Sequence, residues 1–248
     1  MYGDEPPLGS AKVGRSAVSQ PLSDSTQLAA ALQATMFFQG LDEQVLCQFA
    51  AGARWRAYEA GAVIFLEGDM APGFYYVQQG WVKIVKMSPE GREQILYFCG
   101  PGELFGGMSV FANQPMPATA ITLEPTGLWL LQRNVIQQHL AAEPTMALRV
   151  IEFMARRINE LITLVTDLSL RSVTARLARL LLDEAEADLV QRQRWATQSE
   201  LAARLGAAPD VLNRALRTLV EEGLIDLSRQ QIRLLDRQGL AAKAIPDR

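Results

Sequence analysis

The segment TQSELAARLGAAPDVLNRALRTLVEEGLI, residues 197–225, decides the fold of the C-terminal third of the chain. Thr197 and Glu200 have the spacing of a capping box and predict the start of a short helix. Gly206 suits a left-handed turn after that helix, and Pro209 suits the first turn of a second helix. Two helices joined by such a tight turn indicate a helix-turn-helix motif.

The second predicted helix, residues 210–220, has two chemically different faces. Leu212, Leu216 and Leu219 recur at the spacing of one helix face and are expected in the core. The other face presents a carboxylate, an amide and two guanidinium groups, at Asp210, Asn213, Arg214 and Arg217. A solvated charged face is the ordinary interpretation of such a pattern. The preceding cap and turn and the hairpin that follows favour a recognition helix for the DNA major groove instead.

The flanking segments complete a winged helix-turn-helix domain, residues 171–248. Residues 172–188 predict a preceding helix, and the alternating stretch LIDLSRQQIRLL, residues 224–235, predicts a small β-hairpin. This domain has 13 basic and 11 acidic residues, whereas residues 1–170 have 11 basic and 16 acidic residues. The modest positive balance permits contact with DNA phosphates.

Residues 143–170 predict one long helix, because Pro144 suits a first helical turn and no Gly or Pro follows it. Apolar residues in this helix recur at spacings of three and four, which is a heptad pattern. This apolar seam consists of Ile151, Met154, Ile158, Leu161, Val165 and Leu168. Phe153 and Ile162 lie off the seam, so a second face can cover the neighbouring domain. The pattern predicts a homodimer helix; a helix lying only on its own domain is the alternative.

Residues 26–142 predict a β-rich domain. Short β-prone runs alternate with glycine-containing turns between residues 55 and 132, and the turn Ser88-Pro-Glu-Gly91 joins two of them into a hairpin. This spacing is typical of an antiparallel sandwich or roll. Residues 27–51 add one or two short helices, and residues 1–25, rich in Pro, Gly and Ser, predict a flexible tail. The whole chain is expected to have an α+β fold.

Composition excludes several classes of protein. The 248 residues are 49% apolar and include only two cysteines and one histidine, so a disulfide framework, a thiolate metal site and general acid–base catalysis lack the residues they need. No stretch approaches the about 20 consecutive apolar residues that a membrane helix needs, and the N-terminal segment has no apolar signal core. We therefore expect a cytoplasmic protein that has no metal site, is not an enzyme and does not interact with membranes.

Several motifs together resemble the Crp/Fnr family of transcription regulators. They are GAVIFLEGD from Gly61, GWVKI from Gly80, GREQIL from Gly91 and GPGELFG from Gly100, followed by DVLNRALRTLVEEGLI from Asp210. The resemblance implies a cyclic-nucleotide-binding-type β-roll (a double-stranded β-helix), a long dimerisation helix and a C-terminal winged helix-turn-helix. It also implies a homodimeric regulator, more readily an activator, that binds an inverted-repeat operator in double-stranded DNA and contacts RNA polymerase.

The resemblance assigns roles to two sets of residues. Asp210, Asn213 and Arg214 would read bases, and Thr197, Ser199 and Arg217 would contact phosphates. The effector pocket would lie at Gly106, Gly107, Met108, Ser109, Met116 and Pro117. Nucleotide-binding members hold the ribose with a Glu and the cyclic phosphate with an Arg, but Gly107 and Met116 stand at those places here. We therefore expect no binding of cyclic AMP.

Members of the family also respond to signals other than cyclic AMP. No cysteine cluster precedes Cys47, so we do not expect the iron–sulfur centre of the oxygen-sensing members. Haem is an alternative, with ligands drawn from His139, Cys47, Cys99 and Met108, and a redox role of Cys99 is another. Binding to DNA with no ligand is the interpretation we favour. A module that acts on a protein partner, with an inactive helix-turn-helix, is the alternative function.

Overall fold

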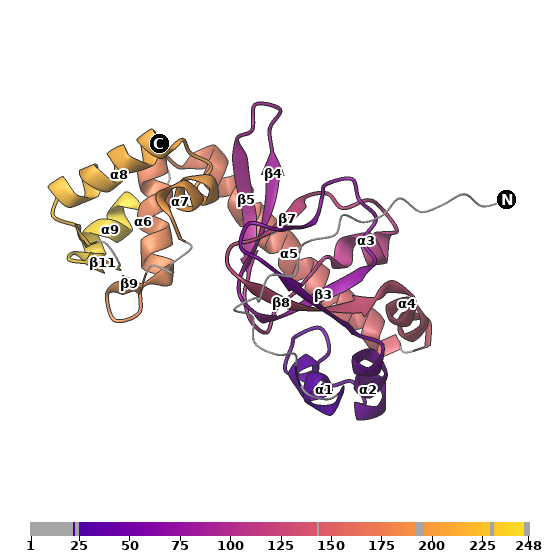
Figure 1. Cartoon of the computed structure of the whole chain (residues 1–248). Coiled ribbons are helices and arrows are strands. Elements are labelled where there is room, and N and C mark those ends of the chain that lie inside the picture. Colours follow the sequence, from indigo (N-terminus) through magenta and orange to yellow (C-terminus); the bar gives the residue numbers. More distant parts are fainter. Residues whose placement is uncertain (1–21, 23–24, 143, 192–195, 229–230, 246–248) are drawn as a thin grey trace.

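The computed structural model describes residues 22, 25–142, 144–191, 196–228 and 231–245. Figure 1 shows a β-roll with helices at its base, a long helix that runs along the roll, and a C-terminal domain of helices and short strands. This is the α+β architecture that the sequence predicts, so the predicted fold class is confirmed.

The roll consists of two antiparallel sheets of four strands each. One sheet has the order β1-β8-β3-β6, with bounds Arg54–Tyr58, Thr126–Gln132, Gly73–Gln79 and Leu104–Phe105. The other has the order β2-β7-β4-β5, with bounds Val63–Phe65, Thr119–Thr122, Val82–Met87 and Glu93–Cys99. The hairpin predicted around the Ser88–Gly91 turn is β4–β5, in which Met87 pairs with Glu93. A short helix, α3 (Gly107–Ala112), follows β6.

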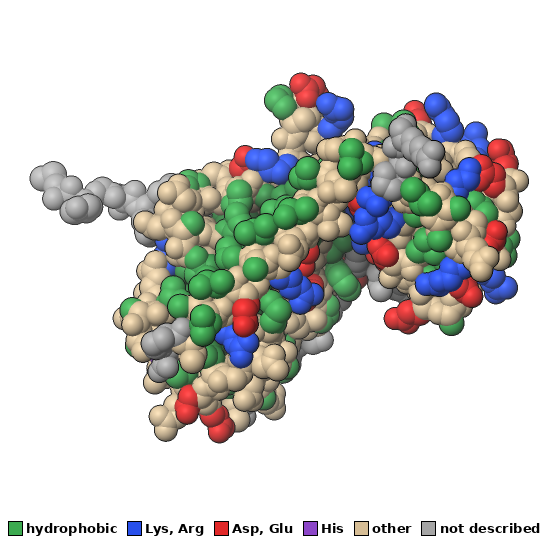
Figure 2. Space-filling view, turned by 180° about the vertical axis from the view of Figure 1, so that it is seen from behind, with side chains coloured by type: hydrophobic (Ala, Val, Ile, Leu, Met, Phe, Trp, Pro, Cys, Tyr) green, Lys and Arg blue, Asp and Glu red, His purple; other side chains and the backbone are tan. Residues whose placement is uncertain are grey.

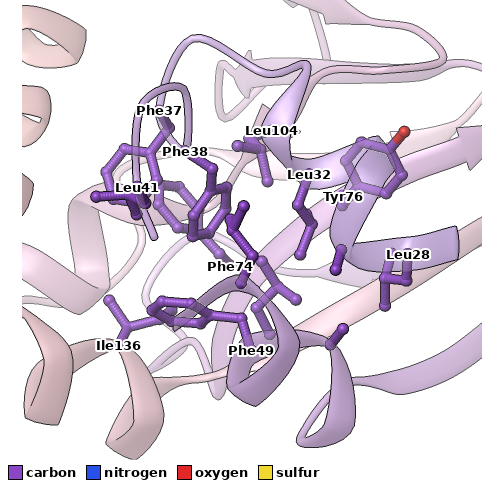
Figure 3. Close-up of a cluster of buried hydrophobic side chains, with 14 of the residues drawn as sticks. Leu28, Leu32, Phe37, Phe38, Leu41, Phe49, Phe74, Tyr76, Leu104 and Ile136 are labelled. Carbon is purple, nitrogen blue, oxygen red and sulfur yellow. The ribbon is translucent and has the colours of Figure 1, made fainter. Parts of the chain in front are cut away.

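Three helices close the base of the roll: α1 (Ser25–Gln33), α2 (Glu43–Ala51) and α4 (Arg133–Ala142). Figure 3 shows the cluster that they bury against β3, in which the rings of Phe37, Phe38, Phe49 and Phe74 converge. Phe37 contacts Phe38 and Phe74 edge to face, with ring centroids 4.8 and 5.1 Å apart. Such edge-to-face packing of aromatic rings adds to the stabilisation from burial of apolar area.

The predicted N-terminal tail, residues 1–25, lies outside the described residues except at Leu22 and Ser25. Leu22 packs on the cluster of buried apolar residues at the base of the roll, and its backbone N–H donates to Gln78 Oε1 at 3.2 Å. Ser25 begins α1. Leu22 is therefore attached to the roll.

The long helix α5 spans Pro144–Leu170, close to the predicted 143–170; residue 143 lies outside the described residues. One face packs on the roll, where the Phe153 ring lies 5.9 Å from that of Phe74 and the Arg157 guanidinium stacks 4.0 Å above the ring of Tyr97. The expectation for Ile162 was wrong, because its side chain is 57% exposed and does not face the roll. No helix in the described ranges is long and apolar enough to cross a membrane.

The C-terminal domain has the predicted helix-turn-helix and wing, with three differences. Its helices are α6 (Val173–Glu184), α7 (Gln198–Arg204), α8 (Pro209–Glu221) and α9 (Arg237–Lys243). Its sheet has the order β10-β11-β9, with bounds Ile225–Leu227, Gln231–Leu234 and Leu189–Gln191. The helix predicted to reach residue 188 ends at Glu184, because Ala187 and Asp188 adopt positive φ and turn the chain into β9. The sequence analysis missed both β9 and α9.

Candidate nucleic-acid interface

Helix α8 is amphipathic, and the core of the C-terminal domain fixes which way it faces. Leu212, Ala215, Leu216 and Leu219 are buried among residues of α6, α7 and the wing. This burial forces the opposite face outward. On that face Asp210, Arg214 and Arg217 are exposed and Asn213 is half-buried. The structure thus brings the four predicted residues onto one outward face of α8, with Asp210, Asn213 and Arg214 in its N-terminal half.

The two arginines of this face have no acidic partner among the residues that the structure describes. Neither Arg214 nor Arg217 forms a salt bridge with another residue of the described ranges. A guanidinium group offers five N–H donors in a fixed planar geometry, which matches the acceptor pair of a guanine edge or two phosphate oxygens. Asp210, in the first turn, adds one acceptor group next to them.

Helix α7 begins at the predicted cap but lacks half of the predicted capping box. The Thr197 hydroxyl accepts a hydrogen bond from the Glu200 N–H at 3.2 Å, as expected for an N-cap. The Glu200 carboxylate was expected to reach back to the cap. It accepts instead from Lys83 Nζ of strand β4, at 3.1 and 3.2 Å. Ser199 is exposed beside Thr197.

The turn between α7 and α8 needs a glycine. Gly206 has φ of +61°, a left-handed conformation that a residue with a Cβ adopts only at a cost. A Cβ at this position would also lie 2.4 Å from Gln94 Oε1 and 2.7 Å from Leu168 Cδ2. The turn therefore sits directly against both the roll and the end of α5.

The residues predicted to form an effector pocket lie in different environments, some buried in the roll and some exposed. The Tyr75 and Phe105 rings stack 5.1 Å apart inside the roll, and Phe65 lies against both. Met116 is only 3% exposed and belongs to the same cluster. Met108 and Pro117 point to the solvent side, with Met108 being 42% exposed. Met116 thus packs in the same buried cluster as these aromatic rings.

The first turn of α3 packs closely against the roll. Gly107 is buried, and a Cβ there would lie 2.2 Å from the Phe74 ring, so no side chain fits without displacing that ring. The buried Ser109 hydroxyl lies 3.2 Å from the Ala71 N–H and 3.0 Å from an N–H of Arg133, and it accepts from both. Arg133 is a residue that sequence reasoning missed, since it begins a helix 24 positions after Ser109. The first turn of α3 is thus packed against Phe74 on one side and bonded to Arg133 through Ser109 on the other.

A separate cleft of about 1180 Å³ lies between the roll and the C-terminal domain. Trp81 of the roll, Leu164 of α5 and two arginines of α6, Arg176 and Arg179, are among its lining residues. Arg179 pairs with Asp167 at 2.8 Å. The Nε of Arg176 is buried without a hydrogen-bond partner in the described part of the chain, and burial lowers the pKa of its guanidinium group. The sequence analysis missed this cleft, because distant segments build it.

The candidate haem ligands lie in different parts of the fold. His139 of α4 packs against Phe49, with ring centroids 4.8 Å apart, and Cys47 of α2 borders the same cluster. Cys99 is fully buried in the interior of the roll, where burial raises the pKa of its thiol to about 12. Among the described residues, no group of three or more His, Cys, Asp and Glu could hold a metal ion.

Comparison with known protein families matches the two domains separately. Residues 55–143 match the family described as "Cyclic nucleotide-binding domain", and residues 175–243 match "Crp-like helix-turn-helix domain". The first match covers the strands of the roll and α4. The second contains α7 and α8, which present the outward face described above.

The chain also aligns with individual bacterial proteins over most of their length. The chain is 30% identical to the "Cyclic AMP receptor protein" of Thermus thermophilus, over 79% of this chain and 90% of the relative. It is 27% identical to the "CRP-like cAMP-activated global transcriptional regulator" of Mycobacterium tuberculosis, over 84% of this chain and 95% of the relative. The structure of FixK2 from Bradyrhizobium japonicum superposes with a TM-score of 0.69 at 22% identity, covering 79% of this chain and 99% of FixK2, which shows a shared fold.

Proposed function

Because the chain belongs to the Crp/Fnr family of DNA-binding transcription regulators, we propose that it binds an inverted-repeat operator as a homodimer and reads each half-site with α8. The family consists of transcription regulators, not enzymes. The observation that carries the proposal is the outward face of α8, where Arg214 and Arg217 are exposed and form no salt bridge with the described residues. As a DNA-binding regulator it would act in the cytoplasm, where the DNA of its bacterial relatives lies.

The proposal gives the residues of this interface distinct roles in binding DNA. Arg214 forms two hydrogen bonds to a guanine, and Asp210 and Asn213 bond to neighbouring base edges. Thr197, Ser199 and Arg217 contact phosphates and fix the register of the helix on the duplex. The exposed positions of Arg214 and Arg217 on one face support this division.

The exposed apolar residues of α5 support a homodimer. Ile151, Ile158 and Val165 of the seam are 63%, 56% and 61% exposed, and Leu161 and Leu168 are exposed beside them. Met154 is half-buried. Figure 2 shows apolar side chains gathered in a broad band on the face along which α5 runs. Water contact at such a band is unfavourable, and pairing with a second copy along the same helix removes it.

The packing of the roll supports the proposal that the protein acts independently of cyclic AMP. Two relatives have names that refer to cyclic AMP, but Gly107 cannot be replaced by an acidic residue without displacing Phe74, and Met116 fills the interior beside Tyr75. A buried cyclic phosphate needs a paired cation, and Met116 supplies none at the place where nucleotide-binding members have an Arg. We propose that the protein binds its operator without a cofactor and activates transcription through contact with RNA polymerase.

Selection from random DNA duplexes tests this function. The full-length protein, without additive, is expected to enrich sequences with two inverted half-sites about one helical turn apart. Addition of cyclic AMP is expected to leave the affinity for the selected duplex unchanged. Enrichment of no inverted repeat would contradict the proposed function, and tighter binding with cyclic AMP would contradict its independence from this nucleotide.

A further inference from the structure

Lys83 lies at the contact between the roll and the DNA-binding domain. Among the residues that the structure describes, it is the only charged residue that is buried, with a side chain 8% exposed. A lysine is rarely buried unless its ammonium group is paired, because removal of the charge from water is costly. The burial of Lys83 near the start of β4 therefore points to a specific pairing.

Two carboxylates from different domains share this ammonium group. Glu93 of β5 binds Lys83 Nζ at 2.5 Å, and Glu200 of α7 binds it at 3.1 and 3.2 Å. Both glutamates are themselves largely shielded, with side chains 30% and 20% exposed. Without the lysine, two like charges would face each other across the domain boundary, so Lys83 both attracts α7 and screens a repulsion.

The contact continues along the whole of α7. Gln94 Nε2 of β5 donates to the Arg204 carbonyl at 3.4 Å, and the Arg204 guanidinium lies 5.3 Å above the Phe98 ring. At the following turn, Gly206 leaves no space for a Cβ against Gln94. Helix α7 is thus held on β5 at both of its ends.

Strand β5 also contacts the helix that supports the proposed dimer. Arg157 of α5 stacks on Tyr97 of β5, and α7 packs against α8. A continuous series of contacts therefore runs from α5 through β5 and α7 to α8. None of these contacts covers the outward face of α8, where Arg214 and Arg217 are exposed. The arrangement positions the recognition helix without blocking it.

We propose that Lys83 holds α7 on β5 and thereby sets the separation of the two recognition helices, which makes it a positioning residue for operator spacing. The proposal rests on the function proposed above. A dimer with this contact intact accepts one separation of half-sites. A dimer that has lost it moves its two DNA-binding domains independently, and so tolerates several separations with lower affinity at the best one.

The test measures binding of Lys83→Met to duplexes that carry the selected half-sites at a series of separations, changed one base pair at a time. We expect about a tenfold loss of affinity at the optimal separation, in the range of measured couplings between contacting residues, and a flatter dependence on spacing. Lys86→Met is the matched control, since Lys86 lies on the same strand but pairs with Glu67 of the roll at 2.5 Å. The control is expected to keep the wild-type profile.

Glu200→Gln supplies a second, milder variant, because it leaves Lys83 paired with Glu93. It is expected to flatten the profile in the same direction. In the double variant the repulsion between Glu93 and Glu200 is gone, so part of the loss seen with Lys83→Met should be recovered. A lysine that acted only by binding DNA would show no such recovery.

Hydrogen exchange tests the same contact in the absence of DNA. Hydrogen exchange at residues 196–206 is expected to be faster in Lys83→Met than in Lys86→Met. Wild-type spacing profiles in both Lys83→Met and Glu200→Gln would overturn this inference but not the proposed function. Tighter binding of Lys83→Met at every separation would also overturn it, because that result would indicate an inhibitory contact. A wild-type protein that prefers no inverted repeat would overturn the proposed function, and the inference with it.

Discussion

The missing Cβ at Gly107 lets the Phe74 ring lie against the first turn of α3. This contact joins the interior of the roll to its helical base, since Phe74 also contacts Phe37 and Phe111. An acidic side chain at position 107 would therefore have to displace Phe74. The sequence showed the Gly in place of a Glu, but only the structure shows that Phe74 occupies the space.

Gly107→Ala tests this packing. A methyl group 2.2 Å from the ring must displace it, so we expect a loss of about 1–3 kcal/mol in the free energy of unfolding, as for other overpacked cores. Chemical denaturation measures it. Gly52→Ala is the control, because a Cβ there makes only ordinary contacts of 3.5 Å or longer. Equal stability of the two variants would contradict the assigned packing.

Buried thiol and phenol groups predict how stability depends on pH. Burial raises the pKa of Cys99 from 9.0 to about 12 and also raises the pKa of Tyr75 and Tyr97 from 10.0. Above about pH 9 the unfolded chain releases these protons while the native state keeps them. The native state then binds more protons, so the free energy of unfolding falls as pH rises from about 9 towards about 12.

Urea denaturation at about pH 8 and about pH 10.5 measures this effect. The midpoint is expected at a lower urea concentration at the higher pH. Tyr97→Phe keeps the ring under Arg157 but removes one titrating group, and is expected to show a smaller difference between the two pH values. An unchanged or higher midpoint at alkaline pH would contradict the assigned burial.

At the scale of elements, local patterns predicted some features well and others poorly. The Thr197 cap, the turn at Gly206 and the outward face of α8 each depend on residues close in sequence, and the structure has all three. The partner of Glu200 was missed, because Lys83 is 117 residues away and its attraction replaces a local hydrogen bond. Strand β9 was missed for the same kind of reason, since three residues gain their strand structure only by pairing with β11.

Ile158→Glu tests the α5 seam as a dimer interface. Ile158 is 56% exposed within one chain, so a glutamate there leaves the isolated fold intact but places two like charges across the interface of a symmetric dimer. We expect at least a tenfold weaker self-association, about 1.4 kcal/mol, measured by sedimentation equilibrium. Asn159→Glu adds the same charge at the neighbouring, off-seam position and should stay dimeric. An Ile158→Glu variant as dimeric as Asn159→Glu would contradict the seam.

At the scale of the whole molecule, each domain depends on contacts that the other parts supply. The roll rests on α5 through Phe153 and Arg157, and α7 rests on the roll through Glu200 and Arg204. The order of domains could be predicted, because each part has its own periodicity and the motifs follow one another. The cleft between the domains could not, since residues from β5, α5, α6 and α7 form it together.

The affinity of Arg214→Ala for variants of the selected operator is the most direct test of the claim that α8 reads DNA. Arg56→Ala, which removes another exposed arginine from β1 of the roll, is the control. We expect Arg214→Ala to lose about 1–3 kcal/mol on the best site and to lose discrimination at a single base pair of each half-site, with Arg56→Ala unchanged. An Arg214→Ala protein that kept the wild-type affinity and base preference at every position would contradict the account.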